Sequence, residues 1–237
     1  MSAEPGRTGI LGGTFDPIHE GHLAAAQAAC SELALDRVLL IPSHRPPHRP
    51  AQPRASAFHR FAMVSLAVDG HPTLMASDVE LQLPGPSYTA TTLRRLSDLG
   101  YLASQLFFIT GTDAFAEIAS WREFPAVLGM AHFVVVSRPG QSFDVLYSRL
   151  PDLVPRFVTG PGGSGRVLES LPGSGRVEQC SIFLVNSHTP DVSSTEIRER
   201  AARGGSLSGL VAPAVERHIR KHGLYGSSPT PSGNGLA

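Results

Sequence analysis

The feature that most limits the fold of this chain is a series of six short segments rich in β-branched and aromatic residues. Most of them are apolar at consecutive positions, which is typical of strands covered on both faces of a parallel sheet. They lie at residues 8–11, 38–41, 73–76, 106–110, 132–137 and 182–186. Helical patterns fall between them, at residues 22–33, 58–68, 89–99, 124–128 and 143–150. Strands that alternate with helices predict an α/β fold with a doubly wound parallel sheet.

Two further helices are expected in the C-terminal part. Ser193 and Glu196 have the spacing of a capping box, so a helix begins there and ends at the glycine pair 204–205. A second helix begins near Pro213, a residue suited to a first turn, and ends at Gly223. The predicted fold class is therefore α/β, a Rossmann-like doubly wound sheet followed by C-terminal helices.

Residues 1–225 are interpreted as a single domain, with one irregular stretch and a tail. Residues 160–177 read GPGGSGRVLESLPGSGRV and contain GSGRV twice, which favours a flexible insertion. A phosphate-binding glycine loop is the alternative, although no strand directly precedes it and no Gly-Lys-Ser/Thr follows. The Ser/Pro/Gly-rich tail, residues 226–237, is predicted to be disordered.

Charge and cysteine content narrow the partners and the location. The 237 residues include 20 Lys plus Arg and 20 Asp plus Glu, so no overall field favours nucleic acid or a membrane surface. The apolar runs are too short to span a bilayer. The two cysteines form no metal-type spacing or disulfide framework, and no leader is evident, which indicates the cytoplasm. Assembly into a homo-oligomer is left open.

Polar residues follow most of the predicted strands. Because the carboxyl ends of parallel strands meet at one edge of a sheet, these residues should lie together where ligands bind at the switch point. The edge would present glycines, hydroxyls, histidines and an arginine, which suits a nucleotide. The residues are Gly12-Gly13-Thr14, Pro42-Ser43-His44, Gly111-Thr112-Asp113, Ser137-Arg138-Pro139 and Ser187-His188-Thr189.

The stretch GILGGTFDPIHEGHL, residues 9–23, is the strongest candidate for the chemistry. Gly12 and Gly13 allow backbone N–H groups to come close to a ligand. The helix that follows directs its free N–H groups and positive dipole end to the same place, which favours phosphate. His19 and His22 are three residues apart and project on one side of that helix start.

Three other interpretations of this stretch compete. The histidines could bind zinc, but no cysteine or carboxylate stands at a suggestive spacing to complete such a site. They could simply cap a helix. The glycines could belong to a dinucleotide fingerprint, but Gly-x-Gly-x-x-Gly is absent here.

The motifs together are more specific than any of them alone. The string GGTFDPIHEGHL resembles the signature of the nucleotidyltransferase superfamily with the His-x-Gly-His motif, in particular the bacterial nicotinate-nucleotide adenylyltransferases. Five other segments match that family in the same order from about Gly9 to Tyr225, apart from the insertion. These are IPSHRPPHRP, PSYTATTL, FITGTDAF with Trp121 after it, SRPG, and VSSTEIRER, in which Val192 stands for isoleucine.

The resemblance implies that ATP and nicotinic acid mononucleotide give deamido-NAD and pyrophosphate, with Mg²⁺ accompanying the ATP. Because the attacking phosphate oxygen is already ionised, catalysis would consist of alignment and charge neutralisation. The implied catalytic residues are His19, His22 and Arg198. The implied ATP-binding residues are Gly12, Gly13, Thr14, Phe15, Gly111, Asp113, Ser193, Ser194, Thr195 and Ile197. The implied acceptor-binding residues are His48, Arg49, Tyr88, Thr89, Trp121 and Arg138; no protein metal site is implied.

Several of these residues have a plainer alternative. Arg198 could be a solvated helix arginine, and a lone tryptophan such as Trp121 is usually packing material. His48 and Arg49 could form an ordinary exposed basic loop.

Other functions stay open at this point. The closest rivals within the superfamily use pantetheine phosphate, glycerol phosphate or nicotinamide mononucleotide as acceptor. A regulatory module could bind a nucleotide without turnover, and a zinc-dependent hydrolase could use the histidines.

Overall fold

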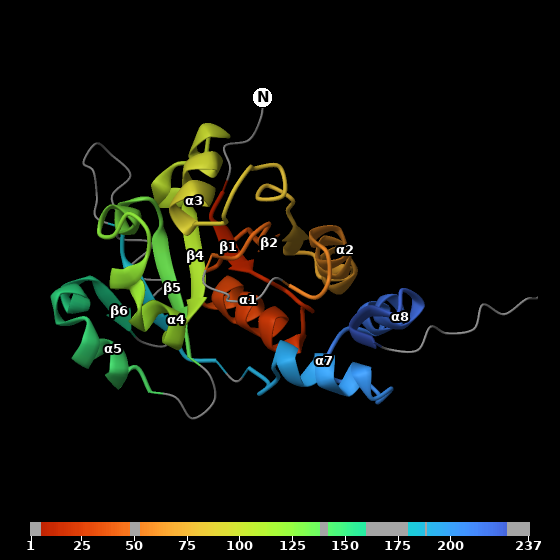
Figure 1. Ribbon diagram of the computed structural model, residues 1–237. Helices are drawn as coiled ribbons and strands as arrows, with labels where there is room; N and C mark the ends of the chain where they lie inside the picture. The colour runs from red at the N-terminus through yellow and green to blue at the C-terminus, as the bar shows by residue number, and fades with distance from the viewer. Residues whose placement is uncertain (1–5, 48–52, 138–141, 160–179, 188, 227–237) are drawn as a thin grey trace, which may run out of the picture.

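The computed structural model describes residues 6–47, 53–137, 142–159, 180–187 and 189–226. These residues form one parallel sheet of seven strands in the order β3-β2-β1-β4-β5-β7-β6 (Figure 1). The strands are β1 Thr8–Gly13, β2 Arg37–Pro42, β3 Leu74–Ala76, β4 Leu106–Gly111, β5 His132–Val136, β6 Phe157–Thr159 and β7 Ile182–Val185.

Helices cover both faces of the sheet. One face carries α1 Glu20–Glu32, α2 Ala57–Val68, α7 Ser194–Ala202 and α8 Pro213–Lys221, whose apolar residues share one buried cluster with the strands. The other face carries α3 Thr89–Asp98, α4 Thr112–Ala116 and α5 Asp144–Arg149, which contribute to a second buried cluster. Figure 1 shows the two groups of helices on opposite sides of the strands.

Short 3₁₀ segments complete the fold: Ala103–Gln105, Ile118–Ser120, Ala126–Gly129, Pro151–Arg156 and Leu224–Gly226.

The five inner strands are buried on both faces because successive side chains point to opposite clusters, whereas the edge strands β3 and β6 are partly exposed. Ile10 belongs to the cluster on the α3 side, whereas its neighbour Leu11 belongs to the cluster on the α1 side. All five residues of β5 are buried. The consecutive apolar runs therefore have the expected cause, and the predicted doubly wound α/β fold is confirmed.

The order of the strands reverses at β1. The chain passes from β1 outward to β2 and β3, and then returns to place β4 on the other side of β1. The loops after β1 and β4 therefore leave the sheet toward opposite faces. This switch point lies where open α/β sheets bind their ligands.

The structure corrects the predicted elements in three places. Strand β6 was not predicted, because three residues that follow a proline-containing 3₁₀ segment carry little periodic signal. The helix predicted over residues 124–128 is wrong: proline at 125 disfavours a helical Phe124, and only the 3₁₀ segment Ala126–Gly129 forms. The five-residue helix α4 was also missed.

The remaining elements agree with the predictions within a few residues. The six predicted strands are present, and both C-terminal helices form. Ser193 caps α7, because its Oγ accepts a hydrogen bond from the Glu196 N–H at 3.1 Å. The predicted insertion at residues 160–177 and all of the tail beyond Gly226 lie outside the described residues. In the part of the chain that is described, every helix is too short or too polar to cross a bilayer.

Candidate active site

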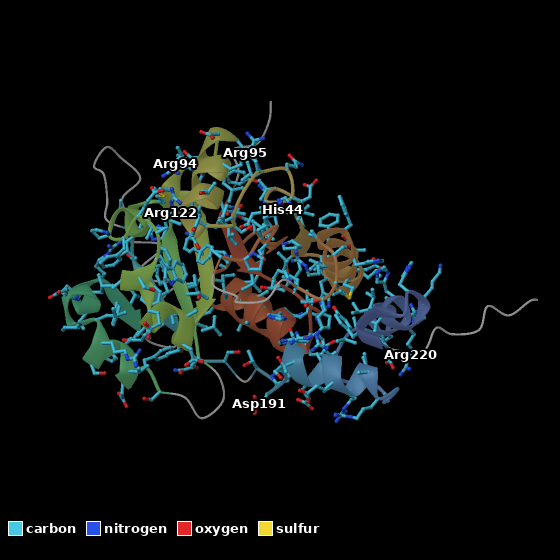
Figure 2. All side chains as sticks on the ribbon, viewed as in Figure 1. His44, Arg94, Arg95, Arg122, Asp191 and Arg220 are labelled. Carbon is cyan, nitrogen blue, oxygen red and sulfur yellow. The ribbon has the colours of Figure 1, made fainter. Side chains whose placement is uncertain are left out.

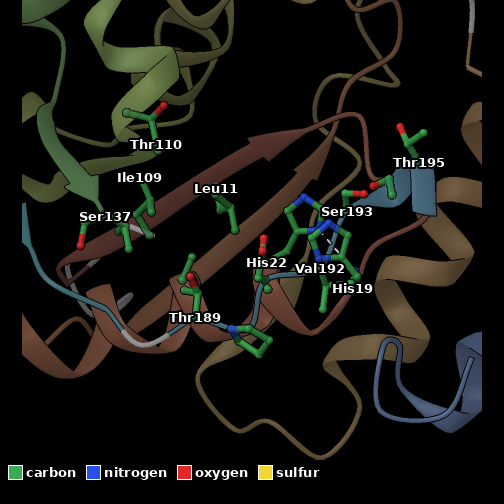
Figure 3. A pocket seen from close by; sticks show the side chains of 17 residues that line it. Leu11, His19, His22, Ile109, Thr110, Ser137, Thr189, Val192, Ser193 and Thr195 are labelled. Atoms are coloured by element: carbon green, nitrogen blue, oxygen red, sulfur yellow. Dashed lines mark hydrogen bonds between the residues drawn. The ribbon is translucent and has the colours of Figure 1, made fainter. Parts of the chain in front are cut away.

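A pocket of about 310 Å³ lies at the carboxyl end of the sheet, between α1 and α7 (Figure 3). We call it the α1–α7 pocket. Figure 3 shows His19, His22 and Ser193 at one end and Ile109, Thr110 and Ser137 at the other. It is lined by Leu11, His19, Gly21, His22, Ala25, Ile109, Thr110, Gly111, Val136, Ser137 and residues 189–195.

The two histidines at the start of α1 form a stacked pair. Their ring centroids are 3.7 Å apart, and His19, the N-cap residue, is buried. The His19 backbone N–H donates to Nδ1 of His22 at 3.2 Å. The edge of Phe15 packs against His22, with centroids 5.0 Å apart. A side chain at Gly21 would come within 3.1 Å of the His19 ring, so glycine leaves the space that this stack occupies.

The loop of residues 14–19, which precedes α1, is fixed through the buried carboxylate of Asp16. That carboxylate accepts hydrogen bonds from the backbone N–H groups of Arg54 at 2.9 Å and Ala55 at 3.1 Å. It also accepts one from the Tyr225 hydroxyl at 2.9 Å. Burial and the negative charge of Asp16 raise the pKa of Tyr225, so the phenol keeps the proton that it donates.

Arg60 connects this loop with the end of β2. Its side chain is only 1% exposed, and its guanidinium donates to the carbonyl oxygens of Thr14 and Ser43, each at 2.6 Å. A third hydrogen bond reaches the Ala55 carbonyl at 3.3 Å. Burial of a guanidinium is costly unless its N–H groups donate hydrogen bonds, and these carbonyl oxygens accept them.

The start of α7 packs against the same loop. Ser194 Oγ donates to the Pro17 carbonyl at 2.9 Å, and Arg198 donates to the Asp16 carbonyl at 2.8 Å. Arg198 also donates to Thr195 Oγ1 at 3.0 Å, which leaves the Thr195 hydroxyl proton available to a ligand. Ser194 and Arg198 thus hydrogen-bond the loop, and both Ser194 and exposed Thr195 line the pocket.

The packing of the protein does not explain why residue 111 is glycine. It ends β4 with a φ of −81°, which any residue can adopt, and a Cβ there would meet no protein atom within 4 Å. By contrast, a Cβ at Gly13 would come within 2.8 Å of the Phe15 ring. Gly13 is required by the fold, whereas Gly111 leaves open space on the rim of the α1–α7 pocket.

A second pocket, of about 400 Å³, lies on the other side of the β4–α4 junction. We call it the α3–α4 pocket; it is lined by Ser87, Tyr88, Thr89, Ala114, Glu117, Ser120, Trp121 and Arg122. Trp121 is half-buried, with its ring 5.9 Å from that of Phe108 in a T-shaped contact. The Arg122 guanidinium lies 4.8 Å from the centre of the Tyr88 ring. Figure 2 shows Arg122 on the α3 side of the sheet.

The structure brings together many of the residues proposed from sequence, in two groups. His19, His22, Gly111 and residues 193–195 line the α1–α7 pocket, and Tyr88, Thr89 and Trp121 line the α3–α4 pocket. The Ile197 side chain is fully buried in the core and does not line either pocket.

Other proposed residues lie near the pockets without lining them. Gly12, Gly13, Thr14 and Phe15 form the end of β1 and the loop after it, and exposed Asp113 lies in α4. His48, Arg49 and Arg138 lie outside the described residues. Within the ranges described, no group of three potential metal ligands is placed to bind an ion, so the zinc interpretation of the histidines gains no support.

Sequence reasoning missed the side chains that fix the loop: Asp16, Arg60 and Tyr225. The sequence did carry a signal for Arg60. Its spacing of three, four and seven residues from Met63, Val64 and Ala67 places it on the buried apolar face of α2. An arginine on such a face needs buried acceptors. Tyr225 offered no comparable signal, because its partner Asp16 is 209 residues away in the chain.

Known proteins are similar to this chain over most of its length. The model of the cytidylyltransferase-like family matches residues 10–200. A protein of Desulfitobacterium hafniense strain Y51 is 40% identical over 230 residues, which cover 95% of this chain and 98% of the relative. A protein of Roseiflexus sp. strain RS-1 is 40% identical over 225 residues, covering 95% and 100%. Both carry the name "Probable nicotinate-nucleotide adenylyltransferase".

Solved structures support the fold. Two structures of the Plasmodium falciparum nicotinic acid mononucleotide adenylyltransferase, complexed with APC and with NaAD, align with TM-scores of 0.65 and 0.67. Each is 16% identical to this chain; the alignments cover 92% and 93% of it, and 96% and 98% of the solved chains.

Proposed function

The chain belongs to the cytidylyltransferase-like family and, within it, to the nicotinate-nucleotide adenylyltransferases, and from this premise we propose which residues perform each part of the reaction. The enzyme transfers AMP from ATP to nicotinic acid mononucleotide, and forms deamido-NAD and pyrophosphate in NAD biosynthesis. The observation that carries the proposal is the pair of pockets on either side of the β4–α4 junction, because the reaction joins two nucleotides.

His22 stabilises the charge that develops on the α-phosphate. An oxygen of the mononucleotide phosphate attacks the α-phosphorus, and the bond from that phosphorus to the leaving pyrophosphate oxygen breaks. His22 Nδ1 accepts the His19 N–H, so a proton on the neutral ring must reside on Nε2. His22 is therefore held as a hydrogen-bond donor, and the stacked His19 ring fixes its orientation.

The start of α7 binds the departing phosphates. Thr195 has its hydroxyl proton available, and the first-turn N–H groups of α7 face an anion favourably. Arg198 and Ser194 hold α7 against residues 14–19, so their role is to position the histidines relative to Thr195. This assignment replaces two expectations from the sequence. One is direct phosphate contact by Ser194, which its hydrogen bond to Pro17 disfavours. The other is a catalytic role for Arg198, whose guanidinium donates to Asp16 and Thr195.

Mg²⁺ would accompany ATP rather than occupy a site built by the protein. The α1–α7 pocket is lined by hydroxyls, imidazoles and backbone with Asp191 as the carboxylate, a donor set that suits phosphate better than a bare cation. The ion would be held mainly by phosphate oxygens and water, as is usual for Mg²⁺ with nucleotides. When bound, it would neutralise triphosphate charge.

Gly111 gives the adenosine of ATP its place at the rim of the α1–α7 pocket. Neither backbone conformation nor packing requires glycine there, so the open space is best explained by a ligand. Gly111→Ala should raise the KM for ATP several-fold without lowering the melting temperature, because alanine suits this φ. Gly129→Ala is the matched control, since a Cβ there also meets no protein atom and Gly129 lies in the 3₁₀ segment before β5.

The α3–α4 pocket binds the mononucleotide, with its pyridine ring on Trp121. Thr89 begins α3, whose first-turn N–H groups can donate hydrogen bonds to the nicotinate carboxylate. A site built for that charge would leave donors unsatisfied by the amide, so nicotinic acid mononucleotide should be preferred over its amide. Equal kcat/KM for the two mononucleotides would show that the carboxylate is not recognised.

Product analysis by mass spectrometry tests the whole assignment. Incubation with ATP, Mg²⁺ and a panel of acceptors should give deamido-NAD and pyrophosphate only with nicotinic acid mononucleotide. An adenylylated pantetheine or other acceptor would identify a different transferase of the superfamily. ATP binding without any product would indicate a non-catalytic module. A cytoplasmic location and assembly into a homo-oligomer stay predictions.

A further inference from the structure

Glu80 is a buried carboxyl group that the reaction described above does not use. It follows β3 in the chain, and its side chain is 7% exposed. Thr92, on the buried side of α3, donates its hydroxyl to Glu80 Oε1 at 2.5 Å. Burial raises the pKa of Glu80, although hydrogen bonds from Ser87 and Thr92 and the positive charge of Arg60 oppose the rise. A carboxyl group in such a place is costly unless its oxygens are hydrogen-bonded or its charge is paired.

The partners of Glu80 belong to the wall of the α3–α4 pocket. Ser87, whose side chain lowers the pKa of the Glu80 carboxyl group, directly precedes Tyr88 and Thr89, and all three line that pocket. Thr92 lies one turn into α3, the helix that Thr89 begins. The carboxyl group therefore joins the pocket segment to the helix that continues it.

The same segment is joined to the end of β2. The His44 N–H donates to Ser87 Oγ at 2.8 Å, and the Ser87 N–H donates to the Arg45 carbonyl at 2.9 Å. Because Ser87 Oγ accepts the His44 N–H, its own proton is free to donate to the Glu80 carboxyl group. Figure 2 labels His44, which lies between α2 and α3 in that view.

The end of β2 is in turn joined to the residues that precede the histidines. Arg60 donates to the Ser43 carbonyl and to the Thr14 carbonyl, each at 2.6 Å. Hydrogen bonds thus run from the loop of residues 14–19 through Arg60 and the end of β2 to Ser87. Ser87 acts on the Glu80 carboxyl group, which Thr92 joins to α3.

We propose that Glu80 is a positioning residue, which sets the place of the acceptor-binding segment 87–89 relative to the catalytic histidines. The inference rests on the proposed assignment of the α3–α4 pocket to the mononucleotide. The effect of Glu80 is on alignment: a shift of the acceptor by about 1 Å can lower the rate on the order of a hundredfold. Glu80 itself touches neither substrate.

Thr92→Val is the most informative variant, because it removes the hydroxyl that Glu80 accepts and keeps the shape of the side chain. We expect kcat/KM for the mononucleotide to fall about tenfold, the size of a lost hydrogen bond to a charged group, while the KM for ATP stays within about twofold. Glu80→Gln should act in the same direction. In the double variant the two effects should not add, because both changes break one interaction.

Thr8→Val is the matched control. Thr8 is another fully buried threonine, whose hydroxyl donates to the Gly6 carbonyl at 3.1 Å at the opposite end of the sheet. It should lower the melting temperature to a similar extent as Thr92→Val and leave the KM values of both substrates unchanged. If Thr8→Val lowers kcat/KM for the mononucleotide as much as Thr92→Val does, loss of stability explains the effect and the inference is wrong.

Trp121→Ala separates failure of this inference from failure of the pocket assignment. If Trp121→Ala leaves the mononucleotide KM unchanged, the α3–α4 pocket does not bind the acceptor. If Trp121→Ala raises it but folded Thr92→Val leaves kcat/KM for the mononucleotide unchanged, the pocket is correctly assigned and Glu80 has no positioning role. A parallel rise of both KM values in Thr92→Val would likewise overturn the inference. Should Glu80→Gln fail to fold, Thr92→Val alone decides.

Discussion

The loop before α1 is fixed by buried charge, whereas the α3–α4 pocket is bounded by half-exposed side chains. Asp16 and Arg60 are 3% and 1% exposed. Asp16 accepts hydrogen bonds and Arg60 donates them, and together they connect four segments of the chain. The Arg122 side chain in the other pocket is 59% exposed. A group that must meet charge developing in a transition state has to be held in advance, while a pocket for a planar ring can be looser.

Removal of the His22 imidazole should have the largest effect on the rate, because His22 follows the rigidly held loop of residues 14–19. His22→Ala should lower kcat about a hundredfold, or about 3 kcal/mol, with a much smaller change in the KM for ATP. Steady-state kinetics would measure both. His71→Ala is the control, because His71 pairs with Gln27 away from both pockets. A folded His22→Ala enzyme with nearly full kcat would remove His22 from catalysis.

Acid should destabilise the fold through His132, the first residue of β5. Burial, and secondarily the positive charge of Arg156, lower the pKa of His132 from 6.5 to about 4. Between about pH 6.5 and pH 4, His132 is protonated in the unfolded chain but stays neutral in the folded protein. The free energy of unfolding therefore falls as the pH drops through this range. The free energy of unfolding should be roughly 2 kcal/mol lower at pH 5 than at pH 7 from this residue.

His132→Asn tests the origin of that pH dependence. Asparagine can still accept the Ser181 N–H, which donates to His132 Nδ1 at 3.0 Å, but it does not titrate. Urea unfolding of both proteins across this pH range should show a flatter profile for the variant. An unchanged slope would assign the acid sensitivity to other groups.

Tyr225→Phe should have an intermediate effect on stability. It tests how far the loop of residues 14–19 depends on the C-terminal segment. The variant loses the hydroxyl that donates to Asp16, which should cost about 1.5 kcal/mol of stability. Because Asp16 belongs to the loop that precedes His19, kcat should also fall, and the KM for the mononucleotide should change little. Thermal unfolding together with kinetics would reveal a purely structural role if only stability changes.

Trp121→Ala should have the smallest effect. Loss of a stacking contact is expected to weaken mononucleotide binding by about 1 kcal/mol, or about fivefold. The melting temperature and the affinity for ATP should barely change, because Trp121 is only half-buried. If the protein instead loses much of its stability while the mononucleotide KM holds, Trp121 is a packing residue and the second pocket is as rigid as the first.

The contrast between the pockets also explains what the sequence could predict. The central strands could be predicted because they are buried on both faces. The phosphate-binding end could be predicted because Gly12 through His22 are contiguous in the chain. Tyr88, Thr89 and Trp121 were recognised only through a family resemblance, since nothing in their local patterns indicates that they share a pocket.

Long-range partners set the limit of prediction. Asp16 meets Tyr225, and Arg198 meets Asp16, only after the fold has formed. Short elements fail for a different reason: α4, with five residues, and β6, with three, carry too few positions to show a period.

A crystal structure with bound deamido-NAD would test the division of labour between the two pockets most directly. We expect the pyridine ring to stack on Trp121 in the α3–α4 pocket, and the pyrophosphate bridge to lie beside His22. The adenosine should pass Gly111 into the α1–α7 pocket, where ATP carries its further phosphates toward Thr195. A pyridine ring bound in the α1–α7 pocket, or a pyrophosphate bridge remote from His22, would contradict the assignment.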